Sequence, residues 1–375
     1  MTVEMIVGSE LDTGLIECWH AIRDSNPALE SPFFCPEYTL AVAGARNDVF
    51  IGIMREAGRI IGFFPFQRTA QGIGKPVGGL LTDYQGAIVL PDAEWSAAEL
   101  LRGCGLKTWE FNHLIASQNA FQPHFQRMEK SHVITLDNGF DAYVEEMRKH
   151  GHRNIHELFR KQRKFVREHG GFDFELCCDD GQALRKVFEW KSAQCRRTGT
   201  VDYFNFNWTR DMVGKIHHTR TPRFSGLLTV LSHHGQVIAA HFGMRAGNVL
   251  HYWFPVYGQA YSDWSPGKML LLKMCEQGVT QGLTRIDLGK GEDVYKRGFA
   301  NDGVALAEGG VYGSSAQAQA IRIQRQLANS IADSRLRKAV RESPAFARIR
   351  PPLRFLRRAI GSASNWIRVV AAYKT

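Results

Sequence analysis

The sequence predicts an α/β (α+β) fold with mixed, mostly antiparallel sheets, built as two similar domains in tandem and followed by a helical tail. Three observations support this prediction. Strand and helix patterns follow the order β-α-α-β-β-β-α-β-α over 172–299, the same order runs more faintly through 1–140, and the C-terminal segment is basic and amphipathic. We expect domains at 1–140 and 172–315, a basic connecting helix at 141–171 and the tail at 316–375.

Composition is that of an ordinary globular chain, with 44% hydrophobic and 22% charged residues. No run of apolar residues is long enough to cross a bilayer, and the N-terminus has no signal-peptide pattern. The seven cysteines are scattered and form no CxxC pair. They indicate free thiols in a reducing compartment, so we expect a cytoplasmic protein.

Charge is concentrated at the C-terminal end of the chain. The chain carries +10 in total, but residues 316–375 carry +11 and residues 1–315 carry −1. Two interpretations of the tail stay open. Its first helix packs on the body and its end is disordered, or the tail is an interfacial anchor that lies on an anionic membrane surface.

The second half has the clearer patterns of alternation and turns. It begins with a strand and two helices, continues with three strands joined by short turns, and ends with a helix, a short strand and a short helix. In order, these elements are expected at 172–178, 181–197, 205–218, 224–233, 237–245, 249–257, 266–281, 284–289 and 292–299.

The first half repeats this order with weaker signals. Helices are expected at 11–26, 35–45 and 93–104, and strands at 49–56, 59–68, 84–90 and 106–114. An Asp-aromatic turn, "TDYQGA" at 82–87, corresponds in this interpretation to "SDWSPGK" at 262–268. The first copy lacks the Ser-Pro-Gly-Lys, so we expect no comparable anion site there.

A run of basic residues lies between the two copies, at 148–167. Charged runs are usually the solvated face of a helix, and here that helix would be a linker. The other interpretation is a basic wall over the cleft that meets a phosphate-bearing ligand. The sequence favours neither of the two.

The stretch "YSDWSPGKMLLLKM" marks the start of the helix expected at 266–281. Ser265 is a good N-cap, and Pro266 suits the first helical position because no N–H is needed there. Gly267 and Lys268 would leave unpaired N–H groups at the positive end of the helix dipole, which favours an anion. Ser-Pro also marks many helix starts that bind nothing.

The runs 261–299 and 152–171 together resemble the GNAT acyltransferase superfamily. They look most like its cellulose-biosynthesis CelD-like branch, which is related to the Fem-type peptidyltransferases. The resemblance is carried by "YSDWSPGK", "IDLG" and "YKRGF" and covers roughly 140–313. It implies two GNAT-like domains, of which the first is degenerate and the second binds acyl-CoA. The CoA pyrophosphate would then lie at the helix end that starts with Ser265, Pro266, Gly267 and Lys268.

Acyl transfer needs a proton acceptor for the nucleophile, donors for the oxyanion and a proton for the thiolate. Alternation places His251, Trp253, Pro255 and Tyr257 on one face of the strand at 249–257. The resemblance implies that this strand offers an N–H to the thioester oxygen. Pro255 predicts a break or bulge there, because it has no N–H for the ladder.

Three residues are the candidate catalytic groups. His241 and Asp287 are possible bases, with His251 a weaker one, and Tyr295 could protonate the thiolate. Each has a structural alternative. His241 could be a core histidine whose hydrogen bonds are satisfied, Asp287 could pair with Arg285, and Tyr295 could be a packed aromatic of a helix. We expect no metal, because the paired histidines lack partners at ligand spacing.

The expected function is acyl-CoA-dependent N- or O-acylation, with acetyl-CoA or another acyl-CoA as co-substrate. The acceptor would be a small-molecule or lipid-linked sugar of an envelope polysaccharide, a suggestion that comes from the resemblance alone. Two alternatives stay open: a Fem-type aminoacyl-tRNA-dependent peptidyltransferase, and a non-catalytic accessory protein of polysaccharide synthesis. Nucleic acid is not the expected partner, and the sequence does not predict an oligomeric state.

Overall fold

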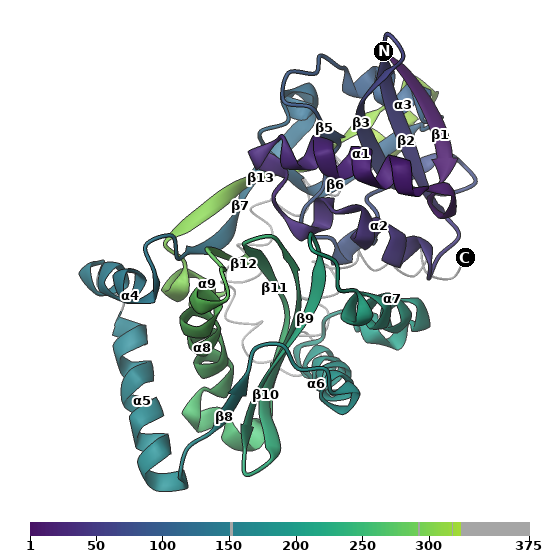
Figure 1. Ribbon diagram of the computed structural model, residues 1–375. Coiled ribbons are helices and arrows are strands. Elements are labelled where there is room, and N and C mark those ends of the chain that lie inside the picture. The colour runs from purple at the N-terminus through teal and green to yellow at the C-terminus, as the bar shows by residue number, and fades with distance from the viewer. Residues whose placement is uncertain (151–152, 292, 317, 324–375) are drawn as a thin grey trace, which may run out of the picture.

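The computed structural model describes residues 1–150, 153–291, 293–316 and 318–323 (Figure 1). Nearly all of the predicted tail, from residue 324 to residue 375, lies outside the described residues. The two interpretations of the tail therefore stay predictions.

The first half holds seven strands and three α-helices, most of them close to the ranges expected from sequence. They are β1 (Thr2–Val7), α1 (Thr13–Asp24), α2 (Pro36–Ala43), β2 (Val49–Glu56), β3 (Arg59–Arg68), β4 (Ile73–Lys75), β5 (Ile88–Val89), α3 (Ala97–Gly103), β6 (Thr108–Ile115) and β7 (Phe125–Thr135). The sequence did not predict β1, β4 or β7.

The region between the halves contains two helices, α4 (Phe140–Lys149) and α5 (Arg153–His169), where a single connecting helix was expected. The second half then follows the predicted order, with one further strand at its end. Its elements are β8 (Asp173–Glu175), α6 (Gly181–Thr198), α7 (Asn207–His218), β9 (Ser225–His233), β10 (Gln236–Ala246), β11 (Val249–Tyr257), α8 (Pro266–Thr280), β12 (Arg285–Lys290), α9 (Val294–Phe299) and β13 (Asp302–Tyr312).

All these strands belong to one mixed sheet. Its order is β1-β2-β3-β4-β6-β13-β7-β12-β11-β10-β9-β8, and β5 pairs with β3 beside this path. The β11–β12 and β4–β6 pairs are parallel, and the other strand pairs are antiparallel. The predicted fold class, a mixed and mostly antiparallel α/β architecture, is confirmed.

The two halves exchange their last strands. β7 follows β6 in the chain but pairs with β12 of the second half, and β13 of the second half lies between β6 and β7. Figure 1 shows β7 and β13 side by side where the halves meet. The sheet therefore runs without interruption through both halves, and the domain limits expected at 140 and 172 remain a prediction.

The internal repeat is visible in the order of elements. β1-α1-α2-β2-β3-β5-α3-β6 in the first half matches β8-α6-α7-β9-β10-β11-α8-β12 in the second. The turns matched from sequence are not equivalent, however. Asp83 and Tyr84 precede β5, whereas Asp263 and Trp264 follow β11, the strand in the corresponding position. The Asp-aromatic turn of the first half therefore lies at the other end of its strand.

Three apolar cores fill the faces of the sheet. One combines side chains under α1 and α2 with side chains under α6 and α7, so it spans both halves. A second lies under α4, α5 and α8, and a third under α3. Among the helices that the structure describes, none has the length and apolar character needed to cross a bilayer.

Candidate functional site

Strands β11 and β12 run parallel for a short distance and then separate. Their register extends from Val249 opposite Arg285 to His251 opposite Asp287, and it ends there. At the same level β11 bulges against β10, because the register between these strands shifts at Gly243. A Cβ on Gly243 would lie 2.2 Å from the carbonyl oxygen of His251, so only glycine permits this approach.

The predicted break at Pro255 is therefore misplaced along β11. Pro255 keeps its partner His241 in the β10 ladder, and the irregularity comes earlier, at Tyr252 and Trp253. The bulge also breaks the expected alternation, because Trp253 and the next residue, Phe254, both enter the core that spans the halves. Pro255 can be accommodated because β12 has already separated from β11 at its level.

Helix α8 begins just beyond the end of β11, after a 3₁₀ turn at Gln259–Trp264. Ser265 has left-handed backbone angles, φ 56° and ψ 50°, and its hydroxyl does not cap the helix. Its side chain lies instead 3.2 Å from Nζ of Lys161, which also donates to the carbonyl of Asp263 at 3.1 Å. The expected side-chain N-cap is thus replaced by a contact with α5.

The helix end offers fewer free donors than expected. The N–H groups of Lys268 and Met269 both donate to the carbonyl of Ser265, and Pro266 has none. Within the described part of the chain the N–H of Gly267 has no backbone acceptor, so one of the two expected free donors remains. Positive side chains also lie around this helix end, among them Lys161.

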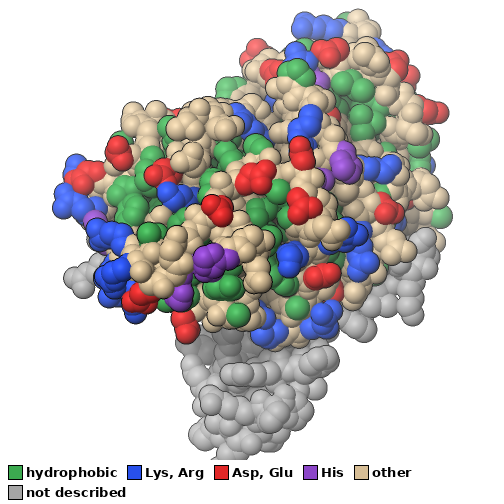
Figure 2. Space-filling view, turned by 60° about the horizontal axis from the view of Figure 1, so that its bottom comes forward, with side chains coloured by type: hydrophobic (Ala, Val, Ile, Leu, Met, Phe, Trp, Pro, Cys, Tyr) green, Lys and Arg blue, Asp and Glu red, His purple; other side chains and the backbone are tan. Residues whose placement is uncertain are grey.

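Helix α5 supplies several of these positive charges. Its apolar side chains pack into the core beneath α8, and Nζ of Lys164 lies 5.4 Å from the ring centre of Trp264. Arg160, Arg163 and Arg167 are exposed. Figure 2 shows Lys and Arg side chains gathered at the edge of the molecule that α5 forms. The helix is therefore packed beside the α8 N-terminus, as the basic-wall interpretation requires.

A buried group of charges lies where β11 and β12 separate. His251 has no exposed surface, and its Nε2 lies 2.9 Å from Oδ2 of Asp83. Its Nδ1 lies 3.5 Å from Oδ1 of Asp287. Burial lowers the pKa of His251, but Asp287 and Asp83 outweigh burial and raise it to about 9. A protonated His251 thus lies between two carboxylates, one from each half of the chain.

Asp287 is fully engaged in this group. Its Oδ1 accepts hydrogen bonds from Ser131 Oγ and from the N–H of Gly289, both at 2.7 Å, and its Oδ2 accepts one from Tyr84. Burial opposes ionisation, but His251 and these donors keep its pKa below the usual value. With its oxygens occupied and its side chain 7% exposed, Asp287 is a buried counter-charge 3.5 Å from Nδ1 of His251.

The other two sequence-predicted catalytic residues form no hydrogen bond or ion pair with this group among the described residues. His241 is fully buried, stacks on Tyr252 with ring centres 4.2 Å apart, and accepts the N–H of Trp253 at 3.2 Å. Burial holds its pKa well below the usual range. Tyr295 packs into the core beneath α8, and burial raises its pKa. Within the described residues no hydrogen bond joins His241, Asp287 and Tyr295, and their catalytic roles stay predictions.

The structure adds residues that sequence reasoning missed. Asp83 has a side chain 26% exposed, which makes it the most open member of the group, and His113 Nε2 lies 3.6 Å from its Oδ1. A Cβ on Gly289 would lie 3.3 Å from Asp83 Oδ2 and 3.7 Å from Lys296 Nζ. The carboxylate of Asp83 and the ammonium of Lys296 therefore both lie beside the Cα of this glycine. Gly289 has φ +75°, which suits glycine.

The chemistry of this group is acid–base and electrostatic. Over residues 1–150, 153–291, 293–316 and 318–323, no cluster of three or more His, Cys, Asp or Glu side chains could hold a metal ion. The cluster instead brings together carboxylates, two imidazoles and an ammonium group. Such groups can accept a proton from a nucleophile and stabilise an oxyanion.

Comparisons with known proteins concern the family and the fold. Residues 152–297 match the family described as Acetyltransferase (GNAT) domain. The fold is similar to that of FemX (10% identity, TM-score 0.52), with 83% of this chain and 96% of that chain covered. It is also similar to the C-terminal domain of a putative lysylphosphatidylglycerol synthetase from Agrobacterium fabrum (13% identity, TM-score 0.51), with the same coverage of 83% and 96%.

At these identities the two solved structures show the fold alone. A search of curated proteins found no match. The family match covers the part of the chain that contains the separating strands, α8 and most of α9. Residues 152–297 are therefore similar to an acyltransferase domain of the GNAT type.

Proposed function

We propose that the chain is an acyl-CoA-dependent acyltransferase whose acceptor attacks the thioester directly. The observation that carries this proposal is the separation of β11 and β12 beyond His251 and Asp287, with the N-terminus of α8 one 3₁₀ turn after β11. A thioester placed between the separated strands would lie beside the buried charge group. The CoA phosphates would lie at the start of α8 and against Lys161.

The acceptor class follows from the resemblance to the CelD-like branch. We propose a sugar or another envelope or exopolysaccharide precursor, free or lipid-linked, and acetyl-CoA as the simplest donor. Acyl transfer by direct attack needs no covalent enzyme intermediate. It needs the nucleophile, a proton acceptor and the thioester carbonyl to lie close together. The charge group where the two halves meet supports such an arrangement, because it brings titratable side chains of both halves to the end of the separating strands.

We expect changes at the α8 N-terminus to weaken donor binding. Lys268→Ala should weaken acetyl-CoA binding by about 1–3 kcal/mol, the scale of a hydrogen bond to a charged group. Gly267→Val should weaken it by obstruction and by shielding the free N–H. Isothermal titration calorimetry with acetyl-CoA measures both effects.

Two controls separate binding from folding. Among the described residues outside its own helix turn, a Cβ on Gly267 would meet Tyr257, at an ordinary 3.4 Å, so Gly267→Ala should fold and bind nearly as well as the natural chain. Lys273→Ala removes a cation of the same helix that pairs with Glu276, and it should leave the affinity unchanged. Unchanged acetyl-CoA affinity in a folded Gly267→Val chain would overturn the donor site.

A Fem-type, aminoacyl-tRNA-dependent transfer is the second candidate. It is favoured by the exposed basic residues of α5 and by the fold shared with FemX. A polyanion bound there through many phosphates would show a steep loss of affinity with salt. A non-catalytic accessory role would leave the chain without affinity for either donor.

The charge of the C-terminal segment supports a peripheral position at the inner membrane face. We expect the full chain to co-sediment with anionic vesicles and to be released by salt, because each basic residue near such a surface contributes about 1 kcal/mol. A chain ending near Ser343 should stay in the supernatant with its acetyl-CoA affinity unchanged. If neither form sediments, the membrane contact is contradicted.

A further inference from the structure

We propose that the outer face of α5 binds an anionic lipid surface and sets the orientation of the chain on it. Four side chains form this face, which we call the basic stripe: Arg160, Arg163, Lys164 and Arg167. The charge of the C-terminal segment supports attachment to a membrane but does not indicate which side of the body meets the lipid. The lipid contact is independent of the proposed acyl transfer, and only its consequence for the acceptor rests on that proposal.

The basic stripe lies on one side of the helix, away from the body. Its members are separated by three or four positions, the spacing that brings side chains together on a helix surface. All four are exposed, the side chain of Lys164 at 52% and that of Arg167 at 73% (Figure 2). The opposite side of α5 packs into the core beneath α8 through Ile155, Leu158 and Phe165. The fold therefore presents the stripe to whatever approaches this edge of the molecule.

Two acids border the stripe and neutralise little of it. Glu168 lies 3.4 Å from Arg167 in a pair exposed enough to contribute little. Glu157 forms no ion pair among the described residues, and neither do Arg160 and Arg163. The positive charge of the stripe is thus available to a polyanion.

Apolar side chains beside the stripe favour a lipid surface over a nucleic acid. Val166 is 48% exposed although it precedes Arg167 directly. The partly exposed ring of Trp264 lies 5.4 Å from Nζ of Lys164. The headgroup layer of a bilayer accepts cations together with apolar and aromatic side chains. Bases can stack on a tryptophan, but a phosphate backbone offers no partner to Val166.

The basic stripe is strong enough to orient the chain but not to anchor it alone. Each basic residue near an anionic surface raises the partition into it about fivefold, so four of them raise it several hundredfold. This is weaker than the marginal binding given by a single myristoyl chain, and stable attachment takes two signals. The stripe would be the second signal, beside the charge of the C-terminal segment.

Orientation by the stripe brings the expected donor site close to the lipid. Lys161 lies on the side of α5 that meets the start of α8, where its Nζ is 3.2 Å from Oγ of Ser265 and 3.1 Å from the carbonyl of Asp263. With the stripe on the headgroups, the N-terminus of α8 lies roughly one helix diameter from them. A lipid-linked acceptor would then need to reach only a short way to the acyl donor.

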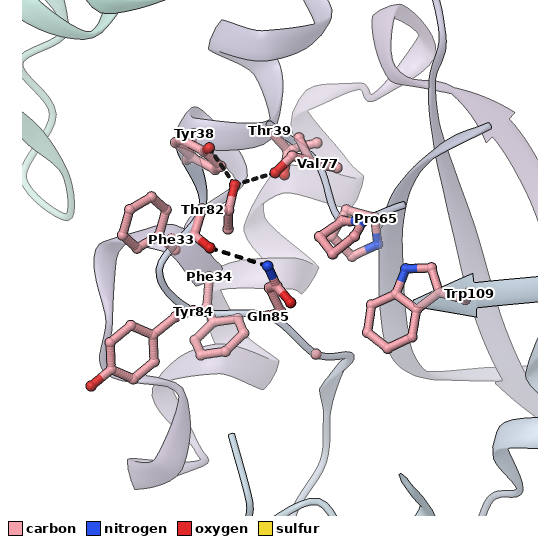
Figure 3. Close-up of a pocket in the computed structure, with 12 residues that line it drawn as sticks. Phe33, Phe34, Tyr38, Thr39, Pro65, Val77, Thr82, Tyr84, Gln85 and Trp109 are labelled. Atoms are coloured by element: carbon pink, nitrogen blue, oxygen red, sulfur yellow. Dashed lines mark hydrogen bonds between the residues drawn. The ribbon is translucent and has the colours of Figure 1, made fainter. Parts of the chain in front are cut away.

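A cavity in the first half is too small to take a sugar acceptor. Its volume is about 20 Å³, room for about one water. Figure 3 shows hydrogen bonds among its lining residues: the hydroxyl of Tyr38 lies 2.6 Å from Oγ1 of Thr82, and Nε2 of Gln85 donates to the carbonyl of Thr82 at 3.1 Å. A sugar acceptor is therefore expected at the surface of the chain, where a lipid carrier could present it.

Co-sedimentation of the full chain with vesicles at physiological salt tests the stripe. Phosphatidylcholine vesicles with and without phosphatidylglycerol are compared, and tRNA binding is measured in parallel. We expect the triple variant Arg160→Gln, Arg163→Gln, Arg167→Gln to bind the anionic vesicles about a hundredfold more weakly than the natural chain, because each residue contributes about fivefold. Val166→Gln should weaken vesicle binding several-fold and leave tRNA binding unchanged, because only the lipid surface uses an apolar side chain.

The triple variant Arg59→Gln, Arg102→Gln, Lys130→Gln is the matched control. It removes three exposed cations of the first half that form no ion pair among the described residues. Vesicle binding should stay within about threefold of the natural value, because the sites are distant from α5. Melting temperatures of both triple variants should match that of the natural chain, because every replaced side chain is exposed.

Three results would overturn the lipid surface. Equal weakening in both triple variants would assign the binding to net charge, and unchanged vesicle binding in the α5 variant would remove the stripe from the contact. Loss of tRNA binding without loss of vesicle binding in the α5 variant would make the stripe a nucleic-acid surface. A chain that binds vesicles through the stripe but never binds acetyl-CoA would refute the proposed transferase and leave the lipid surface standing.

Discussion

Replacing His251 with glutamine is expected to lower the free energy of unfolding by about 3–5 kcal/mol, the usual cost of removing one partner from a buried ion pair. The substitution leaves Asp83 and Asp287 facing one another across a neutral side chain. Asp287 keeps its donors from Ser131 and Gly289, but both carboxylates lose the imidazolium that lies between them. Urea unfolding followed by circular dichroism measures the loss.

Two further variants show whether charge is the cause. Asp83→Asn added to His251→Gln should recover part of the lost stability, because it removes one of the two uncompensated carboxylates. His217→Gln replaces a buried histidine that forms no ion pair among the described residues, and it should cost less than His251→Gln. Equal losses in both histidine variants would show that packing, not charge, explains the effect.

The stability of the chain should also fall at alkaline pH. The folded pKa of His251 is about 9 against an ordinary value of 6.5, so its contribution is complete below pH 6.5 and is lost as pH rises through 9. A shift of this size corresponds to about 3 kcal/mol, because each pKa unit is worth about 1.4 kcal/mol. The pKa of Asp83 is lowered from 3.8 to about 2, so its contribution is present above pH 4 and is lost as pH falls towards 2.

Urea unfolding at a series of pH values measures this dependence. The natural chain should be most stable between pH 4 and 6.5. In His251→Gln the free energy of unfolding should no longer fall as pH rises from 6.5 through 9. An unchanged alkaline slope in His251→Gln would assign the titration to other groups.

The order of elements in the second half could be predicted because its signals are local. Alternation and short turns indicated β9, β10 and β11, and the run from Ser265 to Gly282 indicated α8. Gly282 ends this helix with φ +76°, a conformation that glycine adopts readily. Asp287 could be named as a candidate because it is an acid in a short strand next to the expected cleft, and its catalytic role stays a prediction.

The rest depends on contacts between distant parts of the chain. Asp83 lies 168 positions from His251 along the chain. The sequence comparison paired its turn with the turn at Asp263, because both turns combine an aspartate with an aromatic residue. His113 is an ordinary strand residue until the fold places Asp83 beside it. The exchange of β7 and β13 likewise depends on non-local pairing, which local patterns do not specify.

Thermal unfolding with each donor tests the central claim most directly. Ligand at about one hundred times its Kd should stabilise the folded chain by about 2.7 kcal/mol. We predict that acetyl-CoA raises the melting temperature of the full chain, and that Lys268→Ala requires more acetyl-CoA for the same rise. Aminoacyl-tRNA should give no rise at physiological salt. A rise with aminoacyl-tRNA and none with acetyl-CoA would contradict the account and favour the Fem-type reaction.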